Sequence, residues 1–537
     1  MRVVLLWHLH QPDYRVDGRF TRPWVYLHAL AGYTEMAGHL QACKTMRAVV
    51  NFTPVLLDQL HDYARRLHAW KAHRRPLRDA LLDSLGETPP PGPARAKAVQ
   101  SCLSALDGPR AKREPCYRTL AESALRHDPA TLPDALFTDL LVWFHLCWLG
   151  ESLRADPRAK LLLERAADFG RDERHELLEL IADAITRVVP RWRALADEDR
   201  IELSTSPFYH PLCPLLLDFG SVRDRAPTAA LPSVPYPGGE ERLRWQLDAG
   251  LDRFESLLGR RAAGCWPPEA ALSEATLYQL AKSGFEWTAS SHSVLEATFK
   301  FHTGAGREPF RLFRHPGSGM YCAFRDDGLS DRIGFEYQRW QPADAVRDLT
   351  QHLETIARGP DHDLVLIALD GENPWEYYPD AGGGFLRGLY EALGSHRTLS
   401  PATMKDCVRE LAREAVALPT LRAGSWVHGE LLTWVGHPEK NHAWEMLIDA
   451  KRRYDESGRA DPELRHRLGA CEGSDWFWWP GVHNPTAAVA QFDDLFRAQL
   501  SALYGALELC PPDALSRPFA TGVGHEVAAG GTMQRGS

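Results

Sequence analysis

The chain begins with MRVVLLWHLHQP (residues 1–12), an aliphatic run that ends in aromatic and polar residues. Val3 to Leu6 are β-branched or aliphatic without interruption, which is typical of a strand buried on both faces. Trp7, His8 and His10 follow this run directly. The pattern therefore predicts a buried strand that delivers functional side chains at its C-terminal end.

Further along the chain, predicted strands alternate with predicted helices. The strand candidates are residues 201–206, 284–290, 321–324 and 364–369. The helix candidates are an aromatic stretch at 136–150, a charged one at 174–196 and amphipathic ones at 240–258 and 342–357. This alternation favours a parallel sheet or barrel covered by helices, in which functional residues lie at the C-terminal ends of the strands.

The chain divides into three predicted parts. Residues 1–395 form the β/α part, with a helical insertion at about 60–135 that is interrupted by Pro-rich turns. Residues 396–515 form a helical domain with expected helices at 403–417, 441–454 and 485–507. Residues 516–537 are expected to be a flexible tail, because their end is rich in Gly and small residues.

Composition excludes several classes of protein. The chain has 537 residues, 44% of them hydrophobic and 25% charged, as in an ordinary folded protein, and no stretch is long and apolar enough to span a membrane. Its formal charge of −9 argues against binding to nucleic acid or anionic membranes. The ten Cys residues contain no CxxC pair, which favours a reducing, cytoplasmic location.

Five segments combine acids, His or amides with Trp or Tyr. They are WHLHQP (7–12), STSPFYHP (204–211), GCWPPEAALSE (264–274), ALDGENPWE (368–376) and LTWVGHPEKNHAW (432–444). A pyranose ring offers apolar faces to aromatic side chains and a rim of hydroxyls to polar ones. This combination indicates carbohydrate binding.

Two carboxyl groups are the candidates for cleavage of a glycosidic bond. Glu269 follows Trp266 and two Pro residues, whose restricted backbone holds the next side chain in a fixed direction. Asp370 ends the aliphatic run 364–369 and should project from the end of a buried strand. One carboxyl protonates the leaving oxygen while the other meets the positive charge at the anomeric carbon. Glu269 is the candidate nucleophile and Asp370 the candidate acid/base.

The five segments resemble, in order, the motifs of glycoside hydrolase family 57. The family has an HQP element, a Tyr-His-Pro segment, a Trp-x-x-Glu segment with the nucleophile, an Asp-x-Glu segment with the acid/base, and a Trp-containing helical segment. The nucleophile falls on Glu269 and the proton donor on Asp370. The segments 324–337, 424–430 and 472–479 look most similar to amylase and amylopullulanase-like members, and branching enzymes are a weaker match.

The resemblance implies a distorted (β/α)7 barrel followed by a helical domain that completes the active-site cleft. It also implies retaining glycosidase or transglycosylase activity on an α-glucan or maltooligosaccharide, of the α-amylase, amylopullulanase or 4-α-glucanotransferase type. No cofactor and no metal are expected. The expected substrate-binding residues are His8, His10, Gln11, Tyr209, His210, Trp266, Asp327, Glu372, Trp375 and Trp434.

Other interpretations stay open at this stage. His8 and His10 share one face of a strand and, with a nearby Asp, could chelate a metal, as in a metal-dependent carbohydrate deacetylase or mannosidase. A non-catalytic carbohydrate-binding protein is a further alternative. The cluster of Asp326, Asp327 and Asp331 competes with Asp370 as the source of the acid, although its spacing is also typical of a helix cap.

Two groups of residues allow either a structural or a binding role. Trp476, Trp478 and Trp479 could form a stacking platform for sugar or pack between domains. The group from Glu439 to His442 is typical of a helix start, and Glu274 of a capping residue.

Overall fold

The structure, a computed structural model, describes residues 1–104, 109–459, 461–482 and 484–522. Its centre is a closed barrel of parallel strands in the order β10-β1-β4-β5-β6-β7-β9, with β9 pairing back to β10. The strands are β1 (Arg2–Leu9), β4 (Ala48–Phe52), β5 (Ile201–Thr205), β6 (Gly264–Cys265), β7 (Trp287–Ser291), β9 (Tyr321–Arg325) and β10 (Leu364–Asp370). The predicted distorted (β/α)7 barrel is confirmed.

β1 and β10 form the longest parallel pairing of the barrel, from Arg2 opposite Leu364 to His8 opposite Asp370. Every residue of β1 after Arg2 is buried, because strands flank it on both sides. Five barrel strands match the predicted runs, and β4 and β6 were not predicted. β6 is only Gly264 and Cys265, and a Cβ on Gly264 would lie 1.9 Å from the Trp287 ring.

The strand register brings polar residues into one layer of the barrel. His8 lies opposite Asp370 on one side and opposite Asn51 on the other. Asn51 lies opposite Ser204 of β5. Because residues paired in register on parallel strands project to the same face, these side chains meet near the C-terminal end of the barrel.

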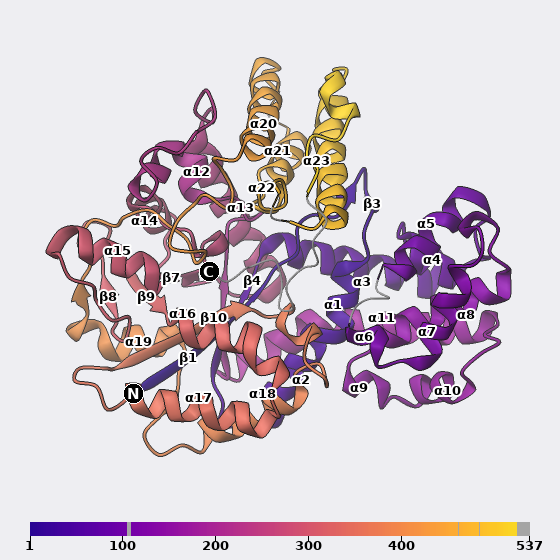
Figure 1. The fold of residues 1–537 in the computed structure, drawn as a ribbon, viewed down its shortest axis with the longest axis horizontal. Helices are drawn as coiled ribbons and strands as arrows, with labels where there is room; N and C mark the ends of the chain where they lie inside the picture. The colour runs from indigo at the N-terminus through magenta and orange to yellow at the C-terminus, as the bar shows by residue number, and fades with distance from the viewer. Residues whose placement is uncertain (105–108, 460, 483, 523–537) are drawn as a thin grey trace.

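The helical insertion is larger than the predicted range of 60–135. Apart from an isolated β-bridge at Asp79, the described residues between β4 and β5 are helical or loop, from α3 (Pro54–His73) to α11 (Arg171–Asp197). α8 (Asp134–Trp148) is buried along most of its length, as a central helix of this insertion must be. Figure 1 shows the insertion as the purple lobe beside the barrel.

The C-terminal helical region begins later than predicted. Within residues 396–437, the first part of the expected helical domain 396–515, β11 (Ser400–Pro401) pairs with β1, and β12 (Val416–Ala417) pairs with β8 (Phe313–Arg314). These two short strands extend the sheet, and the helix expected at 403–417 is α19 (Met404–Leu411), which ends before β12.

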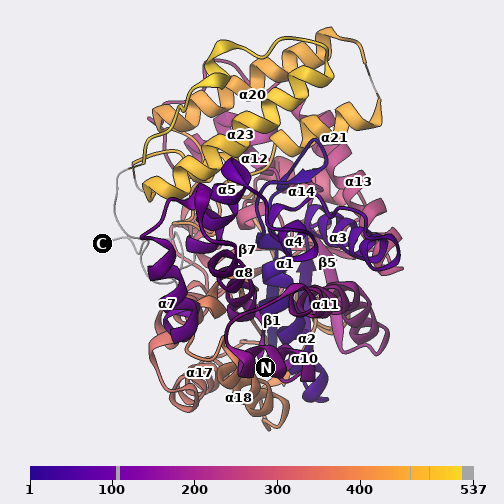
Figure 2. The same cartoon turned by 90° about the vertical axis from the view of Figure 1, so that its right-hand side faces the viewer.

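Helices dominate from residue 438 onwards. They are α20 (Pro438–Glu456), α21 (Pro462–Cys471), α22 (Asp475–Trp478) and α23 (Thr486–Ala506). Figures 1 and 2 show α20, α21 and α23 lying together across one end of the molecule. The side chain of Gln499 in α23 donates to the carbonyls of Asp13 and Arg15, which ties this region to the loop after β1.

The start of the expected flexible tail is attached to the helical region. The Phe519 amide donates to Asp493, and the Thr521 hydroxyl donates to Glu439. Residues 523–537 of the tail lie outside the described residues. None of the helices within the described ranges is long and apolar enough to cross a membrane.

A buried ion pair joins the C-terminal helices to the barrel. Arg242 of α13 (Gly239–Leu258) donates through Nε and Nη2 to Glu472 at 2.6 and 3.0 Å. Tyr236 and Gln246 also donate to Glu472, which is fully buried. Glu472 precedes α22, so this network fixes where the residues that follow it lie.

Removal of Arg242 should destabilise the protein strongly. In Arg242→Ala, Glu472 stays buried without its cation, and loss of one partner of a buried pair costs about 3–5 kcal/mol. The measurement is the free energy of unfolding in denaturant. Arg244→Ala on the same helix removes an exposed pair with Glu240 and should cost less than about 1 kcal/mol. Equal losses in the two variants would contradict the assignment.

Candidate active site

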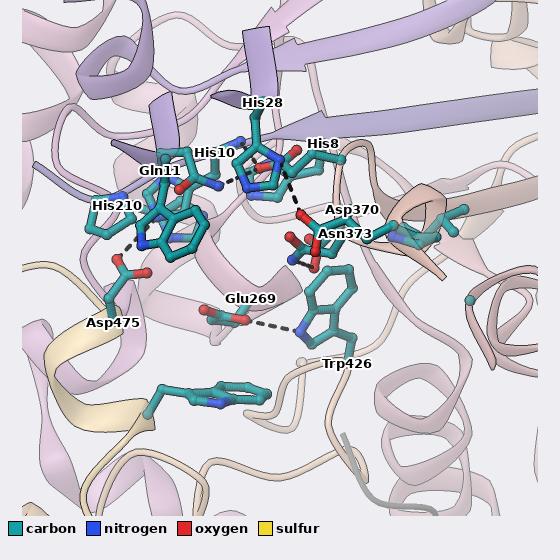
Figure 3. Close-up of a pocket in the computed structure, with 18 of the residues that line it drawn as sticks. His8, His10, Gln11, His28, His210, Glu269, Asp370, Asn373, Trp426 and Asp475 are labelled. Atoms are coloured by element: carbon teal, nitrogen blue, oxygen red, sulfur yellow. Dashed lines mark hydrogen bonds and ion pairs between the residues drawn. The ribbon is translucent and has the colours of Figure 1, made fainter. Parts of the chain in front are cut away.

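A pocket of about 350 Å³ lies at the C-terminal ends of the barrel strands. Seven of the predicted site residues line it: His8, His10, Gln11, His210, Glu269, Asp370 and Glu372. Figure 3 shows Glu269 at its centre, with Trp426 and Asp370 to one side and Asp475 to the other. Both candidate catalytic carboxyls are therefore in one cavity.

The backbone at Glu269 is held in an unusual conformation. Glu269 has φ 60° and ψ 24°, in the left-handed region that non-glycine residues seldom adopt. The preceding Pro267 and Pro268 restrict the chain, and the Glu269 carbonyl accepts from the Trp426 amide. His210 also has φ 60°. Such strain gathers at functional sites, because only the surrounding packing maintains it.

The Glu269 carboxyl accepts one hydrogen bond at each oxygen. Ser474 donates to Oε1 at 3.0 Å, and the Trp426 indole donates to Oε2 at 3.1 Å. Burial, together with the nearby charges of Asp370 and Asp475, raises the pKa of Glu269 to about 8, against the lowering effect of the two hydrogen bonds. Two donors thus orient a carboxyl that is costly to ionise.

Asp370 ends β10 and faces the same pocket. Its Oδ2 accepts from the Asn373 side chain at 3.1 Å. Burial raises the pKa of Asp370 to about 6, against the Asn373 hydrogen bond and the positive charges of His10 and Arg325. Asp370 therefore keeps its proton to a higher pH than an exposed Asp carboxyl does.

His8 is held as a neutral acceptor. Asn51 Oδ1 lies 2.8 Å from His8 Nδ1 and also accepts from Ser206. Because an amide oxygen can only accept, His8 carries its proton on Nδ1 and leaves Nε2 with a lone pair. Burial and, to a smaller extent, the positive charge of His10 lower the pKa of His8 to about 3, against the Asn51 hydrogen bond. His8 therefore can accept from a hydroxyl of the ligand.

His10, His210 and Asp475 form a second polar corner of the pocket. The two imidazole rings stack with their centres 3.8 Å apart. His10 Nε2 lies 3.0 Å from Asp475 Oδ2. Burial lowers the pKa of His210 well below its usual value, as do His10 and His8. Asp475 begins α22 and directly follows Ser474, which contacts Glu269.

Glu372 connects the segment after β10 to the segment after β1. Its Oε1 accepts from Gln11 Nε2 at 3.1 Å and from the His10 amide at 3.3 Å. Gln11 in turn accepts from the Tyr14 hydroxyl. Burial raises the pKa of Glu372 well above its usual value, and the charge of Asp370 adds to this. Gln11 and Glu372 thus fix each other at the pocket wall.

Five of the expected substrate-binding residues do not line the pocket. Trp266 is fully buried, and its ring lies behind His8 and Trp426, at centroid distances of 5.8 and 5.4 Å. The Trp375 indole donates to the Gly371 carbonyl and packs against the ring of Trp7. Both Trp residues therefore support residues of the pocket from behind.

The other three make structural contacts. The Tyr209 hydroxyl is 3.0 Å from His466 Nδ1. Trp434 is fully buried against the Trp478 ring. Asp327 accepts from Ser293 and pairs with the Arg325 guanidinium. A Trp, Tyr or acid next to a polar motif can thus face away from the site. A short sequence motif does not show in which direction such a side chain points.

The competing Asp cluster divides between structural contacts and the pocket wall. Asp326 caps α16 (Asp327–Asp331) by accepting from the Leu329 amide, as its spacing predicted. Asp331 lines the pocket but pairs with Arg325 at 3.0 Å. Glu274 begins α14 (Glu274–Lys282) and is absent from the pocket lining. Glu269 and Asp370 remain the candidate catalytic pair.

Sequence reasoning missed several residues of the pocket. Trp24 and His28 come from α1 (Trp24–His28), and Trp426 comes from an irregular loop. Asp475 was overlooked beside Trp476, although an acid next to aromatic residues was the available signal. Among the three Trp residues left open, Trp478 and Trp479 line the pocket, whereas Trp476 packs on Phe496.

The start of α20 supports these aromatic residues. Lys440 is buried, and its Nζ donates to the carbonyls of Phe477 and Trp478. The structure thus places the group from Glu439 to His442 at a helix start, as its pattern indicated, in contact with the loop that carries the pocket Trp residues.

Comparison with known families identifies the chain. The model of glycosyl hydrolase family 57 matches residues 4–419. The chain belongs to this family. The predicted family is thereby confirmed, and the match spans the barrel with both candidate catalytic residues. A search among curated proteins found no match for this family 57 chain.

Solved structures share the fold across nearly the whole chain. The GH57-type branching enzyme from the archaeon Pyrococcus horikoshii matches with a TM-score of 0.55 and 16% identity, over 97% of this chain and 96% of that one. The α-amylase from Thermotoga maritima matches with a TM-score of 0.57 and 14% identity, over 96% of each chain. For the 4-α-glucanotransferase from Thermococcus litoralis the TM-score is 0.53 and the identity 13%, over 94% of this chain and 59% of that one.

The raised pKa of Glu269 should be visible in the stability of a variant. Burial and nearby carboxylates raise this pKa from 4.5 to about 8, so ionising Glu269 costs the folded state free energy. Glu269→Gln removes that cost. Its stability relative to the native chain should rise between pH 4.5 and 8, with an upper limit of about 1.4 kcal/mol per pKa unit.

Chemical unfolding at several pH values measures this difference. Glu176→Gln, which alters an exposed carboxyl in α11, is the matched control and should show no such trend. A stability difference for Glu269→Gln that is constant from pH 4 to 9 would refute the raised pKa.

Proposed function

We propose that this protein is a retaining glycosidase or transglycosylase that acts on α-glucans, of the α-amylase, amylopullulanase or 4-α-glucanotransferase type. The observation that carries the proposal is the placement of Glu269 and Asp370 in one pocket, where the charge of Asp370 raises the pKa of Glu269. Membership of family 57 supports it. Two coupled carboxyls at one cavity are the equipment that double displacement requires.

In the first step, a Glu269 oxygen attacks the anomeric carbon as the bond from that carbon to the leaving oxygen breaks. The proton of Asp370 moves to the leaving oxygen, and a covalent glycosyl-enzyme forms. In the second step, Asp370 takes a proton from water or from a sugar hydroxyl. That oxygen attacks the anomeric carbon and releases Glu269, which gives hydrolysis with water and transfer with sugar.

The pair shares one proton in the working range of pH. Asp370 ionises at a pKa of about 6 and Glu269 at about 8, so one proton remains on the two groups between these values. Positive charge that develops at the anomeric carbon stabilises ionised Glu269, so the shared proton lies on Asp370. The substrate thus favours the reactive state, in which Glu269 is the nucleophile and Asp370 the acid.

The remaining pocket residues match a glucan chain. His8 and His210 are buried neutral imidazoles beside Glu269, suited to hydrogen bonds with sugar hydroxyls. Trp24, Trp478 and Trp479 provide apolar surface for pyranose faces, and Trp479 stacks on Phe492 with ring centres 4.5 Å apart. Neither step of the proposed double displacement uses a metal ion.

A cytoplasmic location is part of the same proposal. All ten cysteines are free thiols, and eight of them are buried or partly buried. Free thiols are typical of proteins in a reducing compartment.

Substitution of the two carboxyls should separate their roles. Glu269→Ala should lower turnover of maltoheptaose at least about a thousandfold, because the nucleophile is gone. With α-maltosyl fluoride and azide, Glu269→Ala should form the β-glycosyl azide, since azide replaces the missing nucleophile. Asp370→Ala under the same conditions should form the α-glycosyl azide, since azide then attacks the glycosyl-enzyme.

The control is Glu274→Gln, which alters a carboxyl five residues from Glu269 and outside the pocket. It should keep at least half of the native turnover. Unchanged activity in Glu269→Ala, or the same anomer of azide from both variants, would overturn the assigned roles. Products from maltoheptaose, resolved by length, report hydrolysis when all are shorter and transfer when some are longer.

The shared proton predicts a bell-shaped profile of kcat/KM against pH, with limbs near pH 6 and 8. Below the lower limb both carboxyls hold protons and no nucleophile exists, and above the upper limb no acid exists. In Asp370→Asn, assayed with α-maltosyl fluoride, the repulsion on Glu269 is lost, so the limb due to Glu269 should move to lower pH. A flat native profile from pH 5 to 9 would contradict the coupling.

A further inference from the structure

We infer that His10, His210 and Asp475 form a binding site for one Zn²⁺ ion, which excludes sugar from this corner of the pocket. One ligand atom from each residue lies within 4.8 Å of the others. The three come from the ends of β1 and β5 and from α22, and Figure 3 shows them together at one side of Glu269. The effect on sugar binding rests on the proposed function, whereas the ion site itself does not.

Hydrogen bonds on the far side of each ring set the direction of the two imidazoles. His10 Nδ1 lies 3.2 Å from the Thr53 hydroxyl, and His210 Nδ1 lies 2.9 Å from the Ser474 hydroxyl. Each Nε2 atom is therefore the one that points toward Asp475 and the pocket. Histidine ligands of zinc are usually oriented in this way, by a hydrogen bond to the second ring nitrogen.

His210 presents a free lone pair. When Glu269 is ionised, the Ser474 hydroxyl donates its one proton to that carboxylate and therefore accepts from His210 Nδ1. His210 Nε2 is then an acceptor, and it has no partner among the described residues although the residue is only 1% exposed. A buried acceptor without a donor is costly, which indicates that a ligand completes this position.

The donor set fits zinc better than calcium or magnesium. Two imidazole nitrogens and one carboxylate oxygen are usual for zinc with an open fourth position, whereas the harder cations prefer oxygen ligands. Tetrahedral zinc with bonds of about 2.0–2.1 Å holds its ligand atoms about 3.4 Å apart. Asp475 Oδ2 and His10 Nε2 are already 3.0 Å apart. No two of the three ligand atoms are more than 4.8 Å apart, so to reach the tetrahedral spacing any pair must approach by about 1.4 Å at most.

An ion at this position would lie beside the nucleophile. Ser474 contacts both His210 and Glu269, so the ion corner and the carboxylate share one connecting residue. The His210, His10 and Asp475 atoms that would bind zinc are the same atoms that would accept hydrogen bonds from sugar hydroxyls. Zinc and the glucan ring therefore exclude each other, and zinc acts as a competitive inhibitor.

Equilibrium dialysis with Zn²⁺ alone, at pH 7.5 and without carbohydrate, tests the site. The native chain should bind one ion at this site, and His210→Ala and Asp475→Asn should each weaken binding at least tenfold. His28→Gln is the matched control, because His28 also lines the pocket and is buried but pairs with Glu376 on another wall. It should bind zinc as the native chain does. Equal affinity in His210→Ala and the native chain would overturn the site.

Competition with maltoheptaose tests the second part. In Glu269→Gln, which should bind sugar without turnover, saturating maltoheptaose should weaken zinc binding at least fivefold, and zinc should raise KM of the native enzyme without lowering kcat. Zinc binding that ignores maltoheptaose, or activity lost on chelation and restored by zinc, would overturn the inference of competition. Absence of zinc binding with normal turnover would end the inference and leave the proposed function intact.

Discussion

The site depends first on the parallel pairing of β1 with β10. This pairing runs from Arg2 and Leu364 to His8 and Asp370, and it buries an aliphatic face along almost its whole length. A slip by one residue would turn His8 and Asp370 to the opposite face, exchanging each with an apolar neighbour. The hydrophobic effect on the aliphatic residues therefore fixes the polar ones, because Asp370, His8 and Asn51 share one layer only in the observed register.

The barrel alone does not complete the pocket. Glu269 receives its hydrogen bonds from Trp426 and Ser474, which lie 157 and 205 residues further along the chain. The Ser474 amide donates to the His210 carbonyl, so the helical region is attached at a second strained residue of the site. The buried contact of Arg242 with Glu472 holds this attachment from the opposite side. The left-handed backbone at Glu269 persists because these distant contacts stabilise it together.

The sequence predicted the parts of the fold that leave a local pattern. Buried aliphatic strands such as β1 and β10 are continuous apolar runs, and the carboxyl that ends β10 is evident from position alone. β4 has Asn51 inside its apolar run, and β6 has two residues, so neither carries a strand pattern of useful length. Trp266 and Trp426 show the limit for side chains. The first was conspicuous beside a motif but lies behind the pocket, whereas the second reaches it through a loop whose course depends on tertiary packing.

The electrostatics of the pocket give a common reason for both proposed ligands. Glu269, Asp370, Glu372 and Asp475 surround one small cavity, while buried His8 and His210 have lowered pKa values and supply no positive charge. Repulsion among the carboxyls and their desolvation raise the pKa values of Glu269 and Asp370. The ionised form of each carboxyl is therefore unfavourable in the pocket. A cationic anomeric carbon relieves that interaction as the glycosidic bond breaks, which lowers the barrier. A divalent cation between His10, His210 and Asp475 relieves the same interaction without any reaction. The property that makes the pocket suited to an oxocarbenium-like transition state thus also makes it a cation site.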